Sequence, residues 1–126
     1  MDITPRVAEG RQIVESYGEG GFAISGQRYS GSVLVLPDRV QGWPVTELAA
    51  ATPESLAALA DLEEPVEVLL LGCGEKQLFL PPSARQAFKD KLGLVVECMA
   101  TGAACRTYNI LVTEDRRAAA ALIAVD

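Results

Sequence analysis

The sequence of 126 residues predicts an α/β fold in three layers, with a mixed central β-sheet that carries helices on one face and an N-terminal β-hairpin layer on the other. Two patterns predict this class. Residues 11–37 alternate apolar and polar side chains between glycine-rich breaks, which is typical of antiparallel hairpins. Residues 66–125 alternate apolar strands with helices, which is the pattern of a sheet with crossover helices.

The first third of the chain is predicted to be β-structure. The stretches RQIVESYG, GFAISG and QRYSGSVLVLP are separated by glycines, and RVQGWPVT adds a short strand. Trp43 stands before Pro44, and a residue in that position is restricted to extended geometry. We therefore interpret Trp43 as a structural anchor that covers the core, with stacking on a ligand as the alternative.

A short helix and a buried strand are predicted next. The segment TPESLAALADLEE has Thr52 as a helix cap and Pro53 at the first helical position. The strand over 66–71 is continuously apolar, as in strands that are buried on both faces of a parallel sheet, and it ends in the loop 72–74, Gly-Cys-Gly.

Two further helices alternate with two strands up to the end of the chain. PPSARQAFKDKLG predicts a helix that stops at Gly93, and LVVEC predicts the next buried strand. Thr101 is expected to cap the third helix. AAAALIAV is expected to form the last strand despite the helix propensity of alanine.

Length and composition restrict the classes of function. The chain suits one domain over 1–126, with a loosely ordered start over 1–12. A net charge of −6 with scattered Lys and Arg argues against nucleic-acid binding, which depends on clustered basic residues. The apolar runs are shorter than the roughly 20 residues that span a bilayer, so no direct membrane insertion is expected. The N-terminus has no signal or transit pattern, which favours a cytoplasmic protein.

The sequence contains no histidine, which excludes Ser-His-Asp and Cys-His mechanisms and imidazole metal sites. Its three cysteines, Cys73, Cys98 and Cys105, form no CxxC pair and suggest reduced thiols rather than disulfides or a zinc site. We expect neither a metal nor a cofactor.

The third helix has one apolar side at about 100° per residue. That side holds Thr101, Ala104, Cys105, Tyr108, Leu111 and Val112, and Asn109 lies at its margin. Cys105 and Tyr108 are therefore interpreted as core residues, with Tyr108 as a structural anchor and a nucleophilic Cys105 as the alternative.

Two predicted strands end in small residues, in GCG and in MATGAA. If these strands are neighbours, their loops share a cleft at the carboxyl edge of the sheet, and the N-terminus of the third helix points into it. Such a cleft could hold a carboxylate or phosphate, although a lone Gly-x-Gly can also serve only a tight turn. The candidate ligand residues are Gly72, Cys73, Gly74, Thr101, Gly102, Ala103, Asn109 and Arg116.

Several motifs together resemble a known family. SVLVLP followed by Trp43, the strand that ends in Gly-x-Gly, MATGAACRTYNIL with Glu114 and Arg116, and AAAAL are similar to a small uncharacterised-domain family that includes a mitochondrial complex I (NADH:ubiquinone oxidoreductase) assembly factor and an adipogenesis-associated relative. The resemblance runs from about Ile13 onward and indicates a bacterial-like member. One departure is Cys73, where the family more often carries threonine.

The resemblance implies a three-layer α/β fold, no established enzymatic activity and protein contacts in the assembly of a membrane complex. The first hypothesis is therefore a non-catalytic module that binds another protein through a sheet edge or the hairpin layer. The alternative is a small-molecule or anion binder, or an enzyme, that uses the cleft between Gly72-Cys73-Gly74 and Thr101. Glu114 and Arg116 lie about 200° apart on a helix, so each needs its own partner. We interpret them as ties from the helix end to the hairpin, with Glu114 as a structural anchor and catalysis as the alternative.

Overall fold

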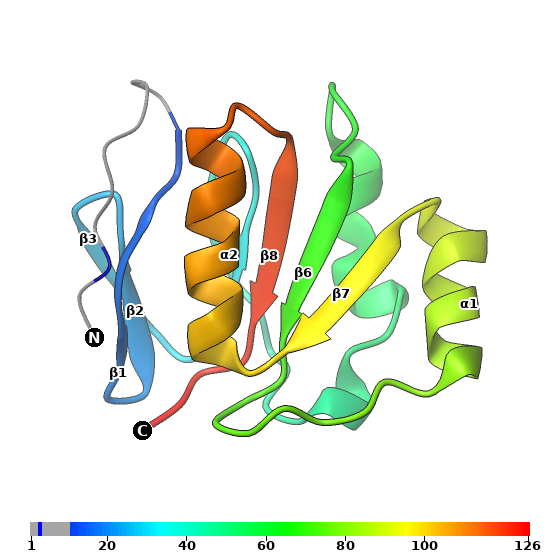
Figure 1. The fold of residues 1–126 in the computed structure, drawn as a ribbon, viewed down its shortest axis with the longest axis horizontal. Coiled ribbons are helices and arrows are strands. Elements are labelled where there is room, and N and C mark those ends of the chain that lie inside the picture. The colour runs from blue at the N-terminus through cyan, green and yellow to red at the C-terminus, as the bar shows by residue number, and fades with distance from the viewer. Residues whose placement is uncertain (1–2, 4–10) are drawn as a thin grey trace.

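The computed structural model describes residue 3 and residues 11–126, and it arranges them as two β-sheets with four helical segments (Figure 1). The expected loosely ordered start over 1–12 lies mainly outside these described residues. In the described part of the chain, no helix has the length and apolarity needed to cross a membrane.

The first sheet is the predicted hairpin layer. It contains β1 (Val14–Gly18), β2 (Gly21–Ile24) and β3 (Gln27–Ser30), each antiparallel to the next. Both turns are two residues long and have positive φ at both positions, 53° and 75° at 19–20 and 49° and 82° at 25–26. Positive φ at both positions is the type I′ geometry, whose twist matches that of a hairpin.

The second sheet has five strands in the order β5-β4-β8-β6-β7, which confirms the mixed central sheet. Its strands are β4 (Val33–Val35), β5 (Val40–Gly42), β6 (Val68–Gly72), β7 (Val95–Met99) and β8 (Ala118–Leu122). β6 is parallel to β7 and β8, while β4 is antiparallel to β5 and β8. The alanine-rich β8 lies in the middle of this sheet with every residue buried. Burial on both faces therefore overrides the helix propensity of its alanines.

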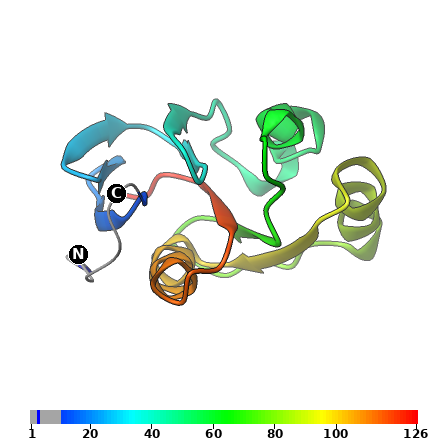
Figure 2. The same cartoon turned by 90° about the horizontal axis from the view of Figure 1, so that it is seen from above.

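The two faces of the central sheet carry different layers. Leu69, Leu71 and Ala121 pack against η1 (Leu48–Ala50), η2 (Glu54–Asp61) and α1 (Pro82–Leu92). Leu70 and Leu122 point the other way, toward the hairpin layer and α2 (Thr101–Thr113). Figure 2 shows α2 on one side of the sheet and the two 3₁₀-helices on the other.

The distribution of the helices therefore differs from the prediction of all helices on one face. α1 connects β6 to its neighbour β7, whereas α2 leads from β7 back across β6 to β8. Crossovers between parallel strands are right-handed, so two crossovers that run in opposite directions along a sheet place their helices on opposite faces. α2 consequently shares its face with the hairpins.

The structure also differs from the sequence-based predictions at four local positions. The helix that follows Thr52 is a 3₁₀-helix with a kink at Leu56, although the Thr52 hydroxyl still accepts a hydrogen bond from the Ser55 N–H at 3.2 Å. The strand expected from residue 66 begins at Val68. β7 is an edge strand with alternate residues exposed, because it has one strand neighbour instead of two. Thr101 is the first residue of α2, and Ala100 is its N-cap.

Candidate functional site

The two loops of the predicted cleft meet directly. The Thr101 N–H donates to the Gly74 carbonyl at 2.8 Å, and the Gly74 N–H donates to Thr101 Oγ1 at 3.0 Å. The same hydroxyl donates to the Ile123 carbonyl at 2.7 Å. A Cβ on Gly72 would lie 3.0 Å from Thr101 Cα. The fully buried Thr101 therefore fills the space between the loops, and its N–H is already used.

A shallow pocket of about 430 Å³ lies beside this junction, at the start of α2. Its lining residues are Tyr17, Glu75, Ala100, Gly102, Ala103, Arg106, Val125 and Asp126. Arg106 Nη1 donates to the Tyr17 hydroxyl at 3.2 Å. Two carboxylate side chains in the lining oppose a bound anion, since like charges repel at short range. Ligand binding by Gly102 and Ala103 stays a prediction.

Cys73 and Cys98 hold the loop that follows β6. Cys73 Sγ accepts a hydrogen bond from the Leu78 N–H at 3.2 Å and donates to the Lys76 carbonyl at 3.3 Å. Cys98 Sγ donates to the Leu78 carbonyl at 3.7 Å. Burial, with Cys73 as neighbour, raises the pKa of the Cys98 thiol to about 11, and burial raises the pKa of Cys105 to about 12. Neutral buried thiols of this kind are poor nucleophiles.

Tyr108 and Asn109 join α2 to the hairpin layer. The Tyr108 hydroxyl donates to the Gln12 carbonyl at 3.0 Å, and burial raises the pKa of its phenol. Asn109 is 4% exposed and bonds both backbone groups of Val14, with its Oδ1 3.0 Å from the N–H and its Nδ2 2.8 Å from the carbonyl. Asn109 thus acts on β1 and lies away from the junction at Thr101.

The remaining candidates lie at the other end of α2 or in the opposite layer. Arg116 forms an exposed ion pair with Glu67 at 3.4 Å, and the Arg117 N–H lowers the pKa of Glu67 by donating to its carboxylate. The helix between Thr101 and this end measures roughly 20 Å at 1.5 Å per residue, so Arg116 does not reach the junction. Glu114 is exposed, and its role as a tie to the hairpin stays a prediction, whereas Arg116 pairs instead with Glu67, just before β6. Trp43 is buried, and its Nε1–H donates to the Ser55 carbonyl at 3.0 Å.

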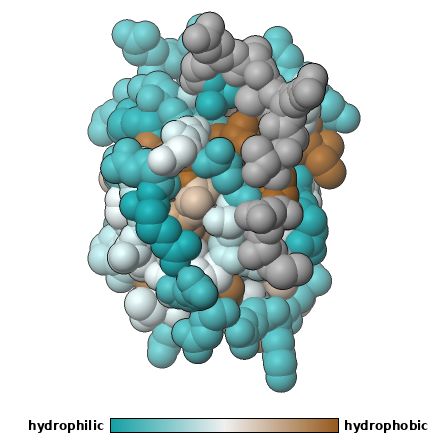
Figure 3. Space-filling view, turned by 90° about the vertical axis from the view of Figure 1, so that its left-hand side faces the viewer, coloured by the Kyte–Doolittle hydropathy of each residue, from teal (hydrophilic) through white to brown (hydrophobic). Residues whose placement is uncertain are grey.

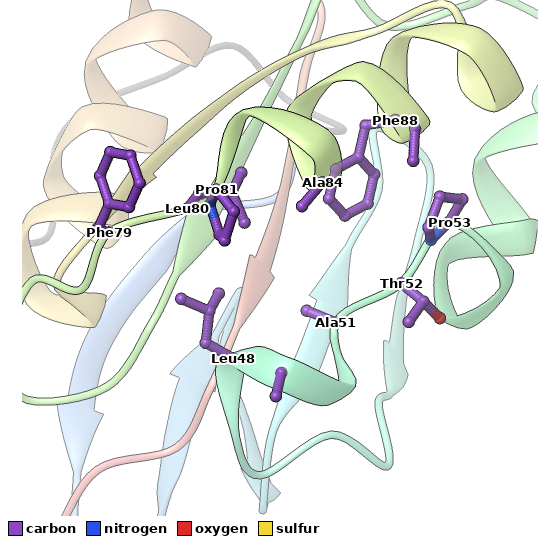
Figure 4. Close-up of a pocket in the computed structure, with 11 residues that line it drawn as sticks. Leu48, Ala51, Thr52, Pro53, Phe79, Leu80, Pro81, Ala84 and Phe88 are labelled. Atoms are coloured by element: carbon purple, nitrogen blue, oxygen red, sulfur yellow. The ribbon is translucent and has the colours of Figure 1, made fainter.

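An apolar groove lies on the face of the sheet opposite α2, between η1 and α1. Its volume is about 440 Å³, and its lining residues are Leu48, Ala49, Ala51, Thr52, Pro53, Phe79, Leu80, Pro81, Ala84, Ala87 and Phe88. Figure 4 shows Leu48 and Ala51 across from Pro81, Ala84 and Phe88, with Phe79 at one end and Pro53 at the other. We call this feature the η1–α1 groove.

The floor of the groove is fixed and one end is exposed. Phe88 and Leu80 belong to the buried core, whereas Phe79 is 77% exposed and its neighbour Leu78 is 49% exposed. Sequence reasoning missed the groove, although a signal is present in QLFLPP, whose apolar residues 78–80 lie in neither a strand nor a helix. By contrast, hydrophilic residues cover much of the described surface on the hairpin side (Figure 3).

The fold defines an α/β protein of a class already seen in solved structures. A protein from Bartonella henselae, described as an outer membrane protein, matches with a TM-score of 0.81 and 36% identity, over 93% of this chain and 98% of that one. A Bordetella pertussis protein described as an Mth938-like domain matches with a TM-score of 0.76 and 33% identity, over 98% and 92% of the two chains.

Residues 14–123 match the family described as protein of unknown function DUF498/DUF598, and the chain belongs to this family. Over 123 residues, or 98% of its length, the chain is 37% identical to the Danio rerio protein named NADH dehydrogenase (ubiquinone) 1 alpha subcomplex assembly factor 3. It spans 70% of that protein and 59% of the Mus musculus protein of the same name. The family resemblance inferred from the motifs is confirmed.

Proposed function

We propose that the protein is a non-catalytic binding module that assists the biogenesis of a membrane protein complex by holding a partner protein in the η1–α1 groove. In this proposal it acts in the cytoplasm as a single α/β domain. The observation that carries the proposal is the exposed Phe79 beside a groove whose floor belongs to the core. Exposed apolar surface next to a preformed apolar depression is typical of interaction sites.

The energetics favour an occupied groove. Burying a phenylalanine side chain contributes about 1.5–3 kcal/mol, and Phe79 has most of its surface still in water. Leu78, the residue before Phe79, is held in place by hydrogen bonds from its backbone to the thiols of Cys73 and Cys98. A partner would therefore lose little free energy in ordering this loop, and preorganisation of this kind raises affinity.

The groove is a better docking surface than the β7 edge of the central sheet. β7 ends the central sheet, and two of its carbonyls accept side-chain hydrogen bonds, Val96 from Arg85 at 2.9 Å and Cys98 from Gln77 at 3.5 Å. An edge strand covered in this way is protected from pairing with another chain. Relatives named as complex I assembly factors support an assembly role for the protein as a whole.

The test uses a photo-crosslinking residue at two exposed apolar positions. p-Benzoylphenylalanine replaces Phe79 in one variant and Ile110, which is 57% exposed on α2, in the control. After irradiation in cells of the native host, we expect an adduct of one discrete mass at position 79 only. That adduct should disappear when Ala84→Glu places a charge in the groove. An equal adduct at position 110, or none at 79, would contradict the proposal.

A further inference from the structure

Exposed acidic residues flank one wall of the η1–α1 groove at both of its ends in the sequence. Residues 47–64 contain this wall, the helix η2 and the loop after it, where Glu63 and Glu64 line a separate depression, and they contain no lysine or arginine. Their five acidic residues, all exposed, are Glu47, Glu54, Asp61, Glu63 and Glu64. Glu47 directly precedes the lining residue Leu48, and Glu54 directly follows the lining residue Pro53.

The opposite wall neutralises only part of this charge. Lys91 of α1 reaches Glu54 with an N–O distance of 3.2 Å, but both side chains are more than half exposed. Exposed ion pairs of this kind contribute little to stability and are readily exchanged for another partner. Arg85 and Lys89 line a different depression, beside β7, and Arg85 donates to the Val96 carbonyl there. The groove therefore combines an apolar floor with the exposed carboxylates of Glu47 and Glu54 beside one wall.

We propose, on the basis of the proposed function, that the occupant is an amphipathic segment of a partner protein with basic residues beside its apolar ones. The apolar side chains enter the groove and cover Phe79, and the Lys or Arg side chains lie over residues 47–64. Opposite charges at a rim steer association and set specificity more than they add affinity. An anionic membrane surface is the wrong occupant, because the same carboxylates repel it.

The test compares two fluorescein-labelled peptides with the same leucine and phenylalanine pattern at helical spacing i, i+3, i+4 and i+7. One peptide has lysine at its polar positions and the other has glutamate. Fluorescence anisotropy should show the lysine peptide binding at least about 10-fold more tightly in about 50 mM NaCl, with a smaller ratio in about 300 mM NaCl, where rim charges are screened. Failure of the lysine peptide to bind, or equal binding of both peptides, overturns the inference.

One double variant and one matched control test whether the carboxylates of this wall attract the basic peptide. The double variant Glu47→Gln and Glu54→Gln should weaken the lysine peptide by about 3- to 10-fold. The matched control is Glu97→Gln with Glu114→Gln, two exposed carboxylates outside this wall, and it should leave the affinity unchanged. Equal losses in the two double variants would show that net charge, and not the groove wall, attracts the peptide.

Phe79→Ala separates the inference from the proposed function on which it rests. This variant should weaken both peptides, because it removes the apolar anchor from an exposed position without disturbing the core. If it weakens both peptides but they bind equally, the groove is a docking site and only its preference for basic residues is wrong. If it weakens neither, the docking function itself fails. Cosedimentation with phosphatidylglycerol vesicles that depends on Phe79 would instead identify a lipid surface.

Discussion

Replacement of Asn109 by alanine should be among the most destabilising single changes in α2. The carboxamide bonds the N–H and the carbonyl of Val14, at 3.0 and 2.8 Å, and also reaches the Ile3 carbonyl at 3.4 Å. Val14 is fully buried, so water cannot replace the lost partner without opening the structure. Each of these two buried backbone groups costs about 1–3 kcal/mol when left without a partner, so Asn109→Ala should lose about 2–6 kcal/mol.

Urea unfolding followed by circular dichroism measures this loss, and hydrogen exchange of the Val14 amide locates it. The control is Tyr108→Phe, which keeps the buried ring and removes one hydrogen bond to the Gln12 carbonyl, for an expected loss of about 0.5–1.5 kcal/mol. A loss below about 1 kcal/mol in Asn109→Ala, with Val14 still protected from exchange, would refute the reasoning.

Two further predictions follow from burial and close packing. Because the folded pKa of Cys98 is about 11 and that of Cys105 about 12, against 9.0 for an ordinary thiol, the unfolded chain loses these protons first. The free energy of unfolding should therefore fall as the pH rises from 9 toward 11, and Cys98→Ala with Cys105→Ala should flatten this dependence in urea titrations. Gly72→Ala should lower the free energy of unfolding by about 1–3 kcal/mol, since its Cβ meets Thr101, whereas Gly42→Ala, with open space around it, should be nearly neutral in the same assay.

The elements that could be predicted from the sequence are those fixed by local patterns. Glycines at positive φ in the turns at 19–20 and 25–26 marked the hairpins, and Gly93, with φ of 68°, marked the end of α1. The family motifs covered most of the chain. Each of these signals depends on residues that are close together in the sequence.

The features that sequence reasoning missed depend on spatial neighbours. Whether β7 has one strand beside it or two decides its exposure, and the strand order alone decides this. Asn109 is among the predicted ligand residues, yet its partner Val14 lies 95 residues away in the sequence. Arg116 was grouped with the loop at Gly72, although the length of α2 separates them.

The rule that ligands bind beyond the carboxyl ends of parallel strands explains both the predicted cleft and the groove. The loops after β6 and β7 meet at that edge, where Gly74 bonds Thr101, and then separate because α1 and α2 go to opposite faces of the sheet. The buried Thr101 fills the space where the two loops meet, so no open cleft remains between Thr101 and Gly74. The loop after β6 continues to the α1 face, and there it leaves Leu78 and Phe79 exposed beside η1. The accessible surface at this edge of the sheet therefore lies on the α1 face, along the loop that follows β6, and not at the junction between the two loops.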